Sequence, residues 1–342
     1  MKNKKNLIIN LILFFIWVAF AVLLTWYAIQ GLKTKILTAV LCSALSIVVH
    51  YFISLFFHEL GHLIFAKANK MKMGYVNFGF FSIDFEKQAS RVKFFTFFGE
   101  NAGESVILPH RSITKEKLCL MAFGGLLFSL IYTILGAVFA ICLSNGVAFC
   151  LLGMAVVPAS YLLVVNSLPI DKTSDGYLIF SNSDYAEVLV AVMNEQRQIV
   201  LGLIPSCPAI FEKSNQPLAR FYYYKHLVIR EKFEMAKCVL NDLSANLSHL
   251  TDDEYQIIFP EIIYKACLSG NLNDENKNLA ENFFVGSASD LASVRAHANF
   301  RMATGENNWA ETLIKTYERL LKSSSKYEKE YEKRLKQFYA DK

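Results

Sequence analysis

The sequence ILTAVLCSALSIVVHYFISLFFHELGHLIFA, residues 36–66, carries His58, Glu59 and His62 near the end of a long apolar run. About 20 apolar residues are enough to cross a bilayer as a helix, so this longer run predicts a long or tilted membrane span. Because polar groups are costly in hydrocarbon, we interpret these three residues as a functional site. The alternative is a set of polar side chains that satisfy one another inside a helix bundle.

The spacing of the two histidines suits a metal ion. His58 and His62 are four residues apart, which places their imidazoles about 40° apart on one helix face. Two imidazoles one turn apart can bind one zinc ion, and Glu59 can take a proton from a water molecule bound beside it. Gly61 predicts close packing of this turn against another element. We interpret His50, farther back on the helix, as a polar contact between helices.

Three further apolar runs, at 6–29, 118–143 and 148–168, are long enough to span a bilayer. The first is too long for the apolar core of a signal peptide, so we expect an uncleaved span. The short turn SNG at 144–146 predicts an antiparallel hairpin of the last two. With 54% hydrophobic and 19% charged residues, the chain is more apolar than an average soluble protein, in which about a quarter of residues are charged.

A β-type segment separates the second and third spans. GYVNFGFFSIDFEK (74–87) and RVKFFTFF (91–98) alternate partly between apolar and polar residues. They predict a hairpin or ribbon over 72–98 at the membrane surface, because an open sheet edge cannot face lipid.

The chain after about residue 205 is polar and helical in period. Three prolines in IPSCPAIFEKSNQP (204–217) mark the boundary. The segments 222–243, 262–284 and 296–321 each pair a helix, a short polar break and a second helix. This pattern is typical of stacked helical hairpins in the size range of tetratricopeptide-type repeats, with an irregular helical bundle as the alternative.

The predicted fold is therefore an α-helical polytopic membrane protein of about four spans. It has a short β-ribbon at the membrane surface and a soluble all-α C-terminal region of helical hairpins. We expect an extra N-terminal span in 1–35, a membrane core in 36–204 and a cytoplasmic helical domain in 205–342.

The charge pattern predicts orientation and excludes some functions. The net charge is +5, and lysines and arginines collect before the first span and between the second and third. The positive-inside rule therefore places both termini and the segment 67–117 in the cytoplasm. No basic patch is interleaved with aromatic residues, so nucleic acid is not expected as a partner. The seven cysteines form no C-x-x-C motif, so we expect neither disulfides nor a thiolate zinc site.

A catalytic zinc ion needs a third protein ligand and an open position. The sequence NSLPIDKTSDGY, residues 166–177, follows the fourth span on the predicted side of the histidines. We favour Asp175, because Gly176 permits a tight turn that could re-aim its carboxylate. Asp171 stays open as a competitor, and a plain Pro and Asp-Gly turn with no metal is a further alternative.

Together, H-E-L-G-H in one span and N-x-x-P with D-G after a later span resemble the site-2 protease family of intramembrane zinc metalloproteases, over about 36–180. Two features depart from the family. The middle core span has Gly124–Gly125 without the proline that often accompanies glycine there. The gap between Pro169 and Asp175 is one residue longer than the commonest form, which keeps Asp171 open.

The resemblance implies one zinc ion per chain, held by His58, His62 and Asp175, with Glu59 as the base. It implies that Asn166 orients the substrate or stabilises the oxyanion. The expected reaction is hydrolysis of a peptide bond in or near the transmembrane segment of a membrane-bound substrate, such as a regulator, a signal peptide or a peptide precursor. The β-ribbon is similar to the β segment that follows the first motif in this family, and its edge either binds an unwound substrate by strand addition or is a simple connector.

Two other functions fit the sequence. One is a non-proteolytic membrane scaffold that binds a partner through its C-terminal helices, and the other is a zinc enzyme acting on a different membrane substrate. The expected partners are the substrate, the bilayer and, through 205–342, a cytoplasmic protein or a second copy. The abundance of Lys, Asn, Ile and Phe suggests an AT-rich bacterial genome, so we expect a bacterial plasma membrane.

Overall fold

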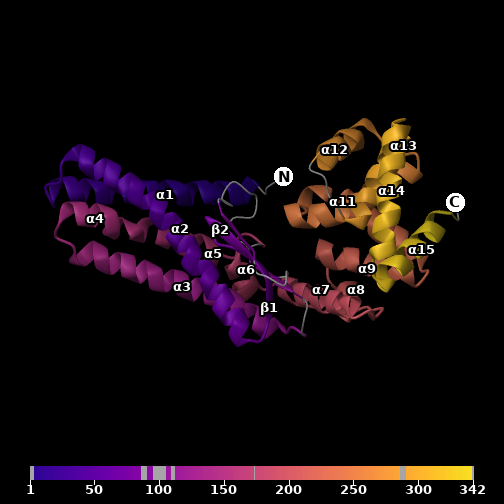
Figure 1. Ribbon diagram of the computed structural model, residues 1–342, viewed down its shortest axis with the longest axis horizontal. Coiled ribbons are helices and arrows are strands. Elements are labelled where there is room, and N and C mark those ends of the chain that lie inside the picture. The colour runs from indigo at the N-terminus through magenta and orange to yellow at the C-terminus, as the bar shows by residue number, and fades with distance from the viewer. Residues whose placement is uncertain are drawn as a thin grey trace. The chain divides into compact units, whose positions relative to one another are not determined.

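The computed structural model describes residues 4–85, 91–94, 105–108, 112–172, 174–285 and 290–340. The chain forms two compact units, one extending to Ala186 and the other covering Glu187–Lys342. Figure 1 shows the helices and strands of each. The predicted boundary at 204/205 lies beyond this division, after α7 (Tyr185–Val200). The three-domain division 1–35, 36–204 and 205–342 stays a prediction.

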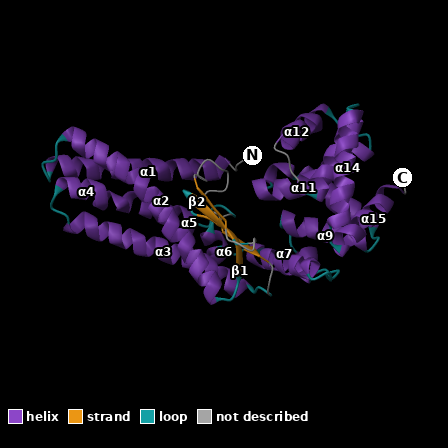
Figure 2. Cartoon of the chain, in the orientation of Figure 1, coloured by secondary structure: helices purple, strands orange, loops and turns teal. Residues whose placement is uncertain are grey.

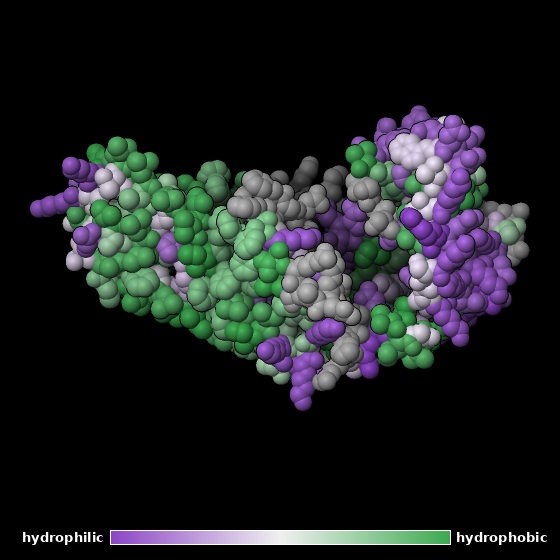
Figure 3. Space-filling model, viewed as in Figure 1, coloured by the Kyte–Doolittle hydropathy of each residue, from purple (hydrophilic) through white to green (hydrophobic). Residues whose placement is uncertain are grey.

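Four helical segments of the first unit are long and apolar enough to cross a membrane, as predicted. They are α1 (Lys4–Gln30), α2 (Ile36–Ala68), α3 (Lys115–Cys142), and a fourth span made of α4 (Gly146–Leu152), the 3-10 turn η2 (Gly153–Ala155) and α5 (Val156–Ser167). Their outer surfaces are strongly apolar, and Phe15 and Leu23 of α1 are each 65% exposed (Figure 3). Such exposure is expected where lipid is the solvent.

Small residues bring these spans close together. A Cβ atom at Gly61 of α2 would lie 2.2 Å from the carbonyl oxygen of Gly124 in α3. A Cβ atom at Gly136 of α3 would lie 2.7 Å from the backbone nitrogen of Val156. Helices in lipid associate through such close packing, because apolar side chains gain little by leaving lipid tails. The predicted close contact at Gly61 is confirmed.

The predicted turn between the third and fourth spans is also present. The side chain of Asn145 accepts hydrogen bonds from the backbone N–H groups of Val147 and Ala148 and so caps α4. This cap lets the chain reverse within a few residues of the end of α3.

The segment between α2 and α3 forms a four-stranded antiparallel sheet in the order β3-β2-β1-β4. Figure 2 colours the strands orange and labels β1 and β2. The strands are β1 (Lys72–Asn77), β2 (Phe81–Asp84), β3 (Arg91–Phe94) and β4 (Ser105–Leu108). The ribbon predicted over 72–98 is present, but the sheet extends beyond it because β4 pairs with β1, with Val76 opposite Ser105. Residues 86–90 and 95–104 lie outside the described residues.

The sheet packs on α2 through aromatic rings. The ring centroid of Phe56 lies 5.2 Å from that of Phe78 and 6.2 Å from that of Phe81. Phe56 is two residues before His58, so this contact places the sheet beside the turn that carries the histidines.

The second unit is helical throughout the part that the structure describes. Its helices are α7, α8 (Ala209–Lys213), α9 (Pro217–Ile229), α10 (Phe233–Ala245), the 3-10 turn η3 (Leu247–His249), α11 (Asp252–Leu268), α12 (Asp274–Val285), α13 (Leu291–Ala303), α14 (Asn307–Ser323) and α15 (Lys326–Ala340). Each of the three predicted polar breaks separates two helices: α9 from α10, α11 from α12, and α13 from α14. The helical-hairpin organisation of the C-terminal region is therefore confirmed.

Buried polar groups connect the last helices of this unit. Arg295 of α13 forms ion pairs with Glu261 of α11 and Glu332 of α15, and all three side chains are almost fully buried. The hydroxyl of Tyr331 donates to Glu261 at 2.9 Å, and that of Tyr317 donates to Glu332 at 2.8 Å. A buried charge is tolerated when it is paired and hydrogen-bonded in this way, so the network joins α11, α13, α14 and α15.

Candidate metal centre

The two histidines of α2 lie on one buried face of the helix. Each is 5% exposed, and their Nε2 atoms are 3.1 Å apart. The one-turn spacing places both rings on the same side of α2, as the sequence predicted. Their Nε2 atoms therefore converge on one point inside the membrane unit.

Asp175 approaches the same point from the short helix α6 (Asp175–Phe180). Its Oδ2 atom lies 3.2 Å from Nε2 of His58 and 3.4 Å from Nε2 of His62. Ser174 caps α6 by accepting a hydrogen bond from the backbone N–H of Tyr177, which fixes Asp175 at the first helical position. The structure thus brings the carboxylate of Asp175 against both histidines.

The prediction that Gly176 permits a tight turn is wrong. Gly176 lies inside α6 and not in a tight turn. A Cβ atom there would lie 2.0 Å from the backbone oxygen of Ser167, at the end of α5. Glycine is needed at this position because two backbones approach closely, and this contact holds Asp175 near the fourth span.

The competitor Asp171 has a different place in the structure. Its backbone carbonyl accepts hydrogen bonds from the backbone N–H and the hydroxyl of Ser174. Asp171 thereby shapes the turn that precedes α6, while Asp175 lies beside the imidazoles.

The pKa of the Asp175 carboxyl reflects this environment. Burial acts to raise the pKa, but the adjacent imidazoles of His62 and His58 outweigh burial and lower it to about 2. The carboxylate is consequently ionised at neutral pH, which is the form that binds a metal ion.

The three donor atoms have the spacing of one face of a metal tetrahedron. Zinc–nitrogen and zinc–oxygen bonds of about 2.0–2.2 Å require neighbouring ligand atoms to be roughly 3.3–3.6 Å apart. The observed separations are 3.4 Å, within this range, and 3.1 and 3.2 Å, which are shorter than its lower end by 0.2 Å or less. The three side chains therefore fit a single small divalent cation.

The other nitrogen of each imidazole is held by α3. Nδ1 of His62 lies 2.9 Å from the carbonyl oxygen of Met121, and Nδ1 of His58 lies 2.9 Å from the hydroxyl of Ser129. A carbonyl only accepts, so Nδ1 of His62 carries the proton and its Nε2 presents a lone pair. This lone pair faces the carboxylate Oδ2 of Asp175, which makes no hydrogen bond to any described residue. A nitrogen lone pair and a carboxylate oxygen that face each other in this way would together stabilise a bound cation.

Glu59 lies beside the donor set but is held differently. It is 1% exposed, and its carboxylate lies within 4.8 Å of the ring nitrogens of His58 and His62. The hydroxyl of Ser105, at the start of β4, donates to its Oε2 atom at 2.5 Å. This position suits a base that acts on a group bound beside the histidines.

Asn166 reaches the centre from the last turn of α5. Its Nδ2 atom lies 3.4 Å from Nε2 of His58. The amide is thus close enough to hydrogen-bond a group held at the donor set.

Glycine in α3 makes room for the imidazoles. A Cβ atom at Gly125 would lie 2.4 Å from Cε1 of His62 and 2.9 Å from Cε1 of His58. The Gly124–Gly125 pair therefore allows α3 to pass the face of α2 that carries the two histidines, without a proline in this span.

His50 lies apart from the donor set. Its Nδ1 atom is 2.5 Å from the hydroxyl of Tyr132, and its Nε2 is 2.9 Å from the carbonyl oxygen of Leu151. It joins α2 to α3 and α4, so the interpretation of His50 as a polar contact between helices is confirmed.

Sequence reasoning missed two residues of this site, Ser129 and Ser105. The sequence indicates a role for Ser129 only weakly, by placing its hydroxyl group in an apolar span. It does not indicate a role for Ser105, because only the pairing of β4 with β1 brings that residue to Glu59.

Replacement of Ser129 by Ala should lower metal affinity about 10- to 100-fold, as is typical for loss of an outer partner of a metal-binding histidine. Nδ1 of His58 would lose its hydrogen-bond partner, and the ring would lose its fixed orientation. The measurement is competition for the metal with a chromophoric chelator. Thr133→Ala is the matched control, because Thr133 lies one turn away on α3 and its hydroxyl bonds only the carbonyl of Ser129. Equal affinity of Ser129→Ala and wild type would contradict this role.

Comparison with known proteins agrees with this geometry. The family model for peptidase family M50 matches residues 46–329, which is most of the chain and includes all the residues of the centre. Searches of the curated proteins and of the solved structures found no match. The chain therefore belongs to peptidase family M50, the site-2 protease family of membrane metalloproteases.

Proposed function

We propose that this protein is a zinc-dependent endopeptidase that hydrolyses a peptide bond in or near the transmembrane segment of a membrane-bound substrate. The observation that carries the proposal is the donor set of His58, His62 and Asp175, with Nε2, Nε2 and Oδ2 atoms 3.1–3.4 Å apart. Two imidazoles and one carboxylate are a ligand set that zinc accepts while keeping a position open. One zinc ion per chain is expected.

Zinc bound there would supply Lewis acidity, which acidifies water and polarises a carbonyl. The other steps belong to the chain's own residues. Glu59 takes the proton of the attacking water and later passes it to the leaving amine. Ser105 holds the Glu59 carboxylate in place through its hydrogen bond. The amide of Asn166 orients the scissile carbonyl and donates to the oxygen on which negative charge develops.

The substrate must offer an unwound segment to this centre, because the carbonyl groups of an intact helix are already hydrogen-bonded. The sheet lies beside the active turn of α2, and β4 contributes Ser105 to it. An edge of this sheet could hold the unwound segment by strand addition. A regulator, a leftover signal peptide or a peptide precursor with one span would satisfy this requirement.

The proposed location is a bacterial plasma membrane with both termini in the cytoplasm. The lysines before α1 and the basic residues between α2 and α3 support this orientation. It puts the donor set near the cytoplasmic end of α2, where water can reach it.

Metal removal tests the proposal directly. Purified protein treated with 1,10-phenanthroline should lose cleavage of a panel of single-span substrates in liposomes, and zinc added back at one equivalent should restore it. Bound zinc, measured by mass spectrometry of the metal, should be one per chain. Cleavage that survives complete metal removal would contradict the proposal.

Other results would favour the alternatives. Stoichiometric zinc with no peptide cleavage across the panel would favour a zinc enzyme that acts on another membrane substrate. A protein that binds no zinc would favour a scaffold that acts through its C-terminal helices.

A further inference from the structure

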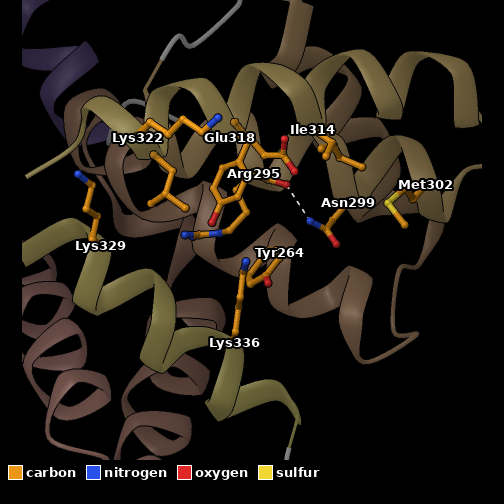
Figure 4. A pocket seen from close by; sticks show the side chains of 12 residues that line it. Tyr264, Arg295, Asn299, Met302, Ile314, Glu318, Lys322, Lys329 and Lys336 are labelled. Carbon is orange, nitrogen blue, oxygen red and sulfur yellow. Dashed lines mark hydrogen bonds between the residues drawn. The ribbon is translucent and has the colours of Figure 1, made fainter.

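A groove in the helical unit lies outside the metal centre and has no part in the proposed reaction. Its cavity volume is about 940 Å³, at the upper end of the range typical of ligand sites. Side chains of α11, α13, α14 and α15 line it (Figure 4). The buried network around Arg295 joins the same four helices, so the groove has a fixed floor.

The groove is rich in basic side chains. Lys322 of α14 and Lys329 and Lys336 of α15 line it and are exposed, whereas Glu318 is the one acidic residue among its lining residues. Lys329 and Lys336 are seven residues apart, which places them on nearly one face of α15, roughly 10 Å apart along its axis. Within the part of the chain that the structure describes, none of the three ammonium groups has a carboxylate within 4.0 Å.

The floor of the groove adds an unsatisfied donor. Arg295 is 3% exposed and lines the groove. Its two terminal nitrogens bond Glu332 and Glu261, while its Nε atom has no hydrogen-bond partner among the described residues. The charge of Arg295 is thus neutralised internally, and the lysines are the charges available to a ligand.

The other end of the groove is apolar. Figure 4 shows Lys322 and Lys329 toward one end and Met302 and Ile314 toward the other. Met302 is 51% exposed, so its side chain is accessible to a ligand in the groove. A ligand that fits must therefore carry negative charge at one end and an apolar group at the other.

One polar group between these ends suits a polypeptide. The Nδ2 of Asn299 donates to the backbone oxygen of Arg295 at 3.0 Å. Its Oδ1 makes no hydrogen bond to a described residue, so it can accept from a peptide N–H.

From this arrangement we propose that the groove binds a short acidic segment of another polypeptide, with Asp or Glu side chains on the lysines and an apolar side chain against Met302 and Ile314. Charge complementarity supports this occupant, and the concave shape fits a chain segment better than a flat membrane surface. The proposal does not depend on proteolysis.

The test uses the full chain in detergent with Glu59→Gln, so that no bound peptide is cleaved. The probe is a pool of eight-residue peptides in which Asp or Glu alternates with Leu, Ile or Phe. A matched pool replaces Asp and Glu with Lys and Arg. Peptides retained on the immobilised protein are quantified by mass spectrometry. We expect retention of the acidic pool over the basic pool, falling as salt rises.

Substitutions of residues that line the groove test whether the acidic peptides bind there. The double change Lys329→Glu and Lys336→Glu should lower retention of the acidic pool roughly tenfold or more, since two exposed charge pairs become repulsive. Met302→Asp should also lower it. The matched control is Lys315→Glu with Lys333→Glu, because both lysines are exposed on α14 and α15 but do not line the groove.

Three results would overturn the proposal. The first is equal retention of the acidic and basic pools. The second is an equal loss of binding in the groove variant and the control variant. The third is lysine-dependent retention of dihexanoyl phosphatidylglycerol without retention of any peptide, which would assign the groove to an anionic lipid.

Discussion

Replacement of Glu59 by Gln should abolish peptide-bond cleavage while the protein keeps its zinc. The change retains the size of the side chain and removes the group that accepts the proton. Loss of a general base lowers the rate by about 10²- to 10⁴-fold, so cleavage should fall at least a hundredfold. The side chain is 1% exposed, and its carboxylate is held in place by the hydroxyl of Ser105. The measurement is the initial rate of cleavage in liposomes, with zinc content determined on the same samples.

The control for this change is Glu116→Gln. Glu116 is an exposed residue in the first turn of α3, so the same chemical change there should leave both rate and zinc content as in wild type. Wild-type rates in Glu59→Gln would disprove the role of Glu59 as the base. Loss of zinc from the variant would instead make Glu59 a ligand.

Replacement of Asp175 by Ala should lower zinc affinity by more than the roughly 10- to 100-fold typical of an outer partner, because a direct ligand is removed. The two imidazoles would remain but could hold the metal only from one side. Cleavage should fall in parallel at limiting zinc. Affinity is measured by competition with a chromophoric chelator at neutral pH. The lowered pKa of Asp175, about 2, means that its carboxylate is ionised above that pH and loses its charge only below it. A neutral-pH comparison therefore measures loss of the ligand and not a change of protonation.

Asp171→Ala is the matched control for Asp175. Asp171 is the aspartate that the sequence left open, and it contributes its backbone carbonyl to the turn before α6. Its replacement should leave zinc affinity within about threefold of wild type, since the backbone is unchanged. The opposite pattern, with zinc lost from Asp171→Ala and kept by Asp175→Ala, would exchange the two roles.

Local sequence patterns were sufficient to predict much of the fold and part of the candidate site. The number of spans follows from the lengths of the apolar runs, because a bilayer demands about 20 apolar residues per crossing. The placement of His58 and His62 on one helix face follows from the 3.6-residue period. The polar breaks of the C-terminal hairpins could also be predicted, because a helix ends where its apolar period is interrupted. Each of these features depends on residues that are near one another in the chain.

Only the tertiary structure decided the features that depend on distant segments. Asp175 lies beside the histidines, and Asp171 does not take that place, because Gly176 packs against the backbone of Ser167. Ser105 reaches Glu59 through the pairing of β4 with β1, and the groove of the second unit exists because four helices meet around Arg295. No local period encodes such contacts. They arise from close packing of segments that the chain brings together only when it folds, and the chemistry of this protein is built from them.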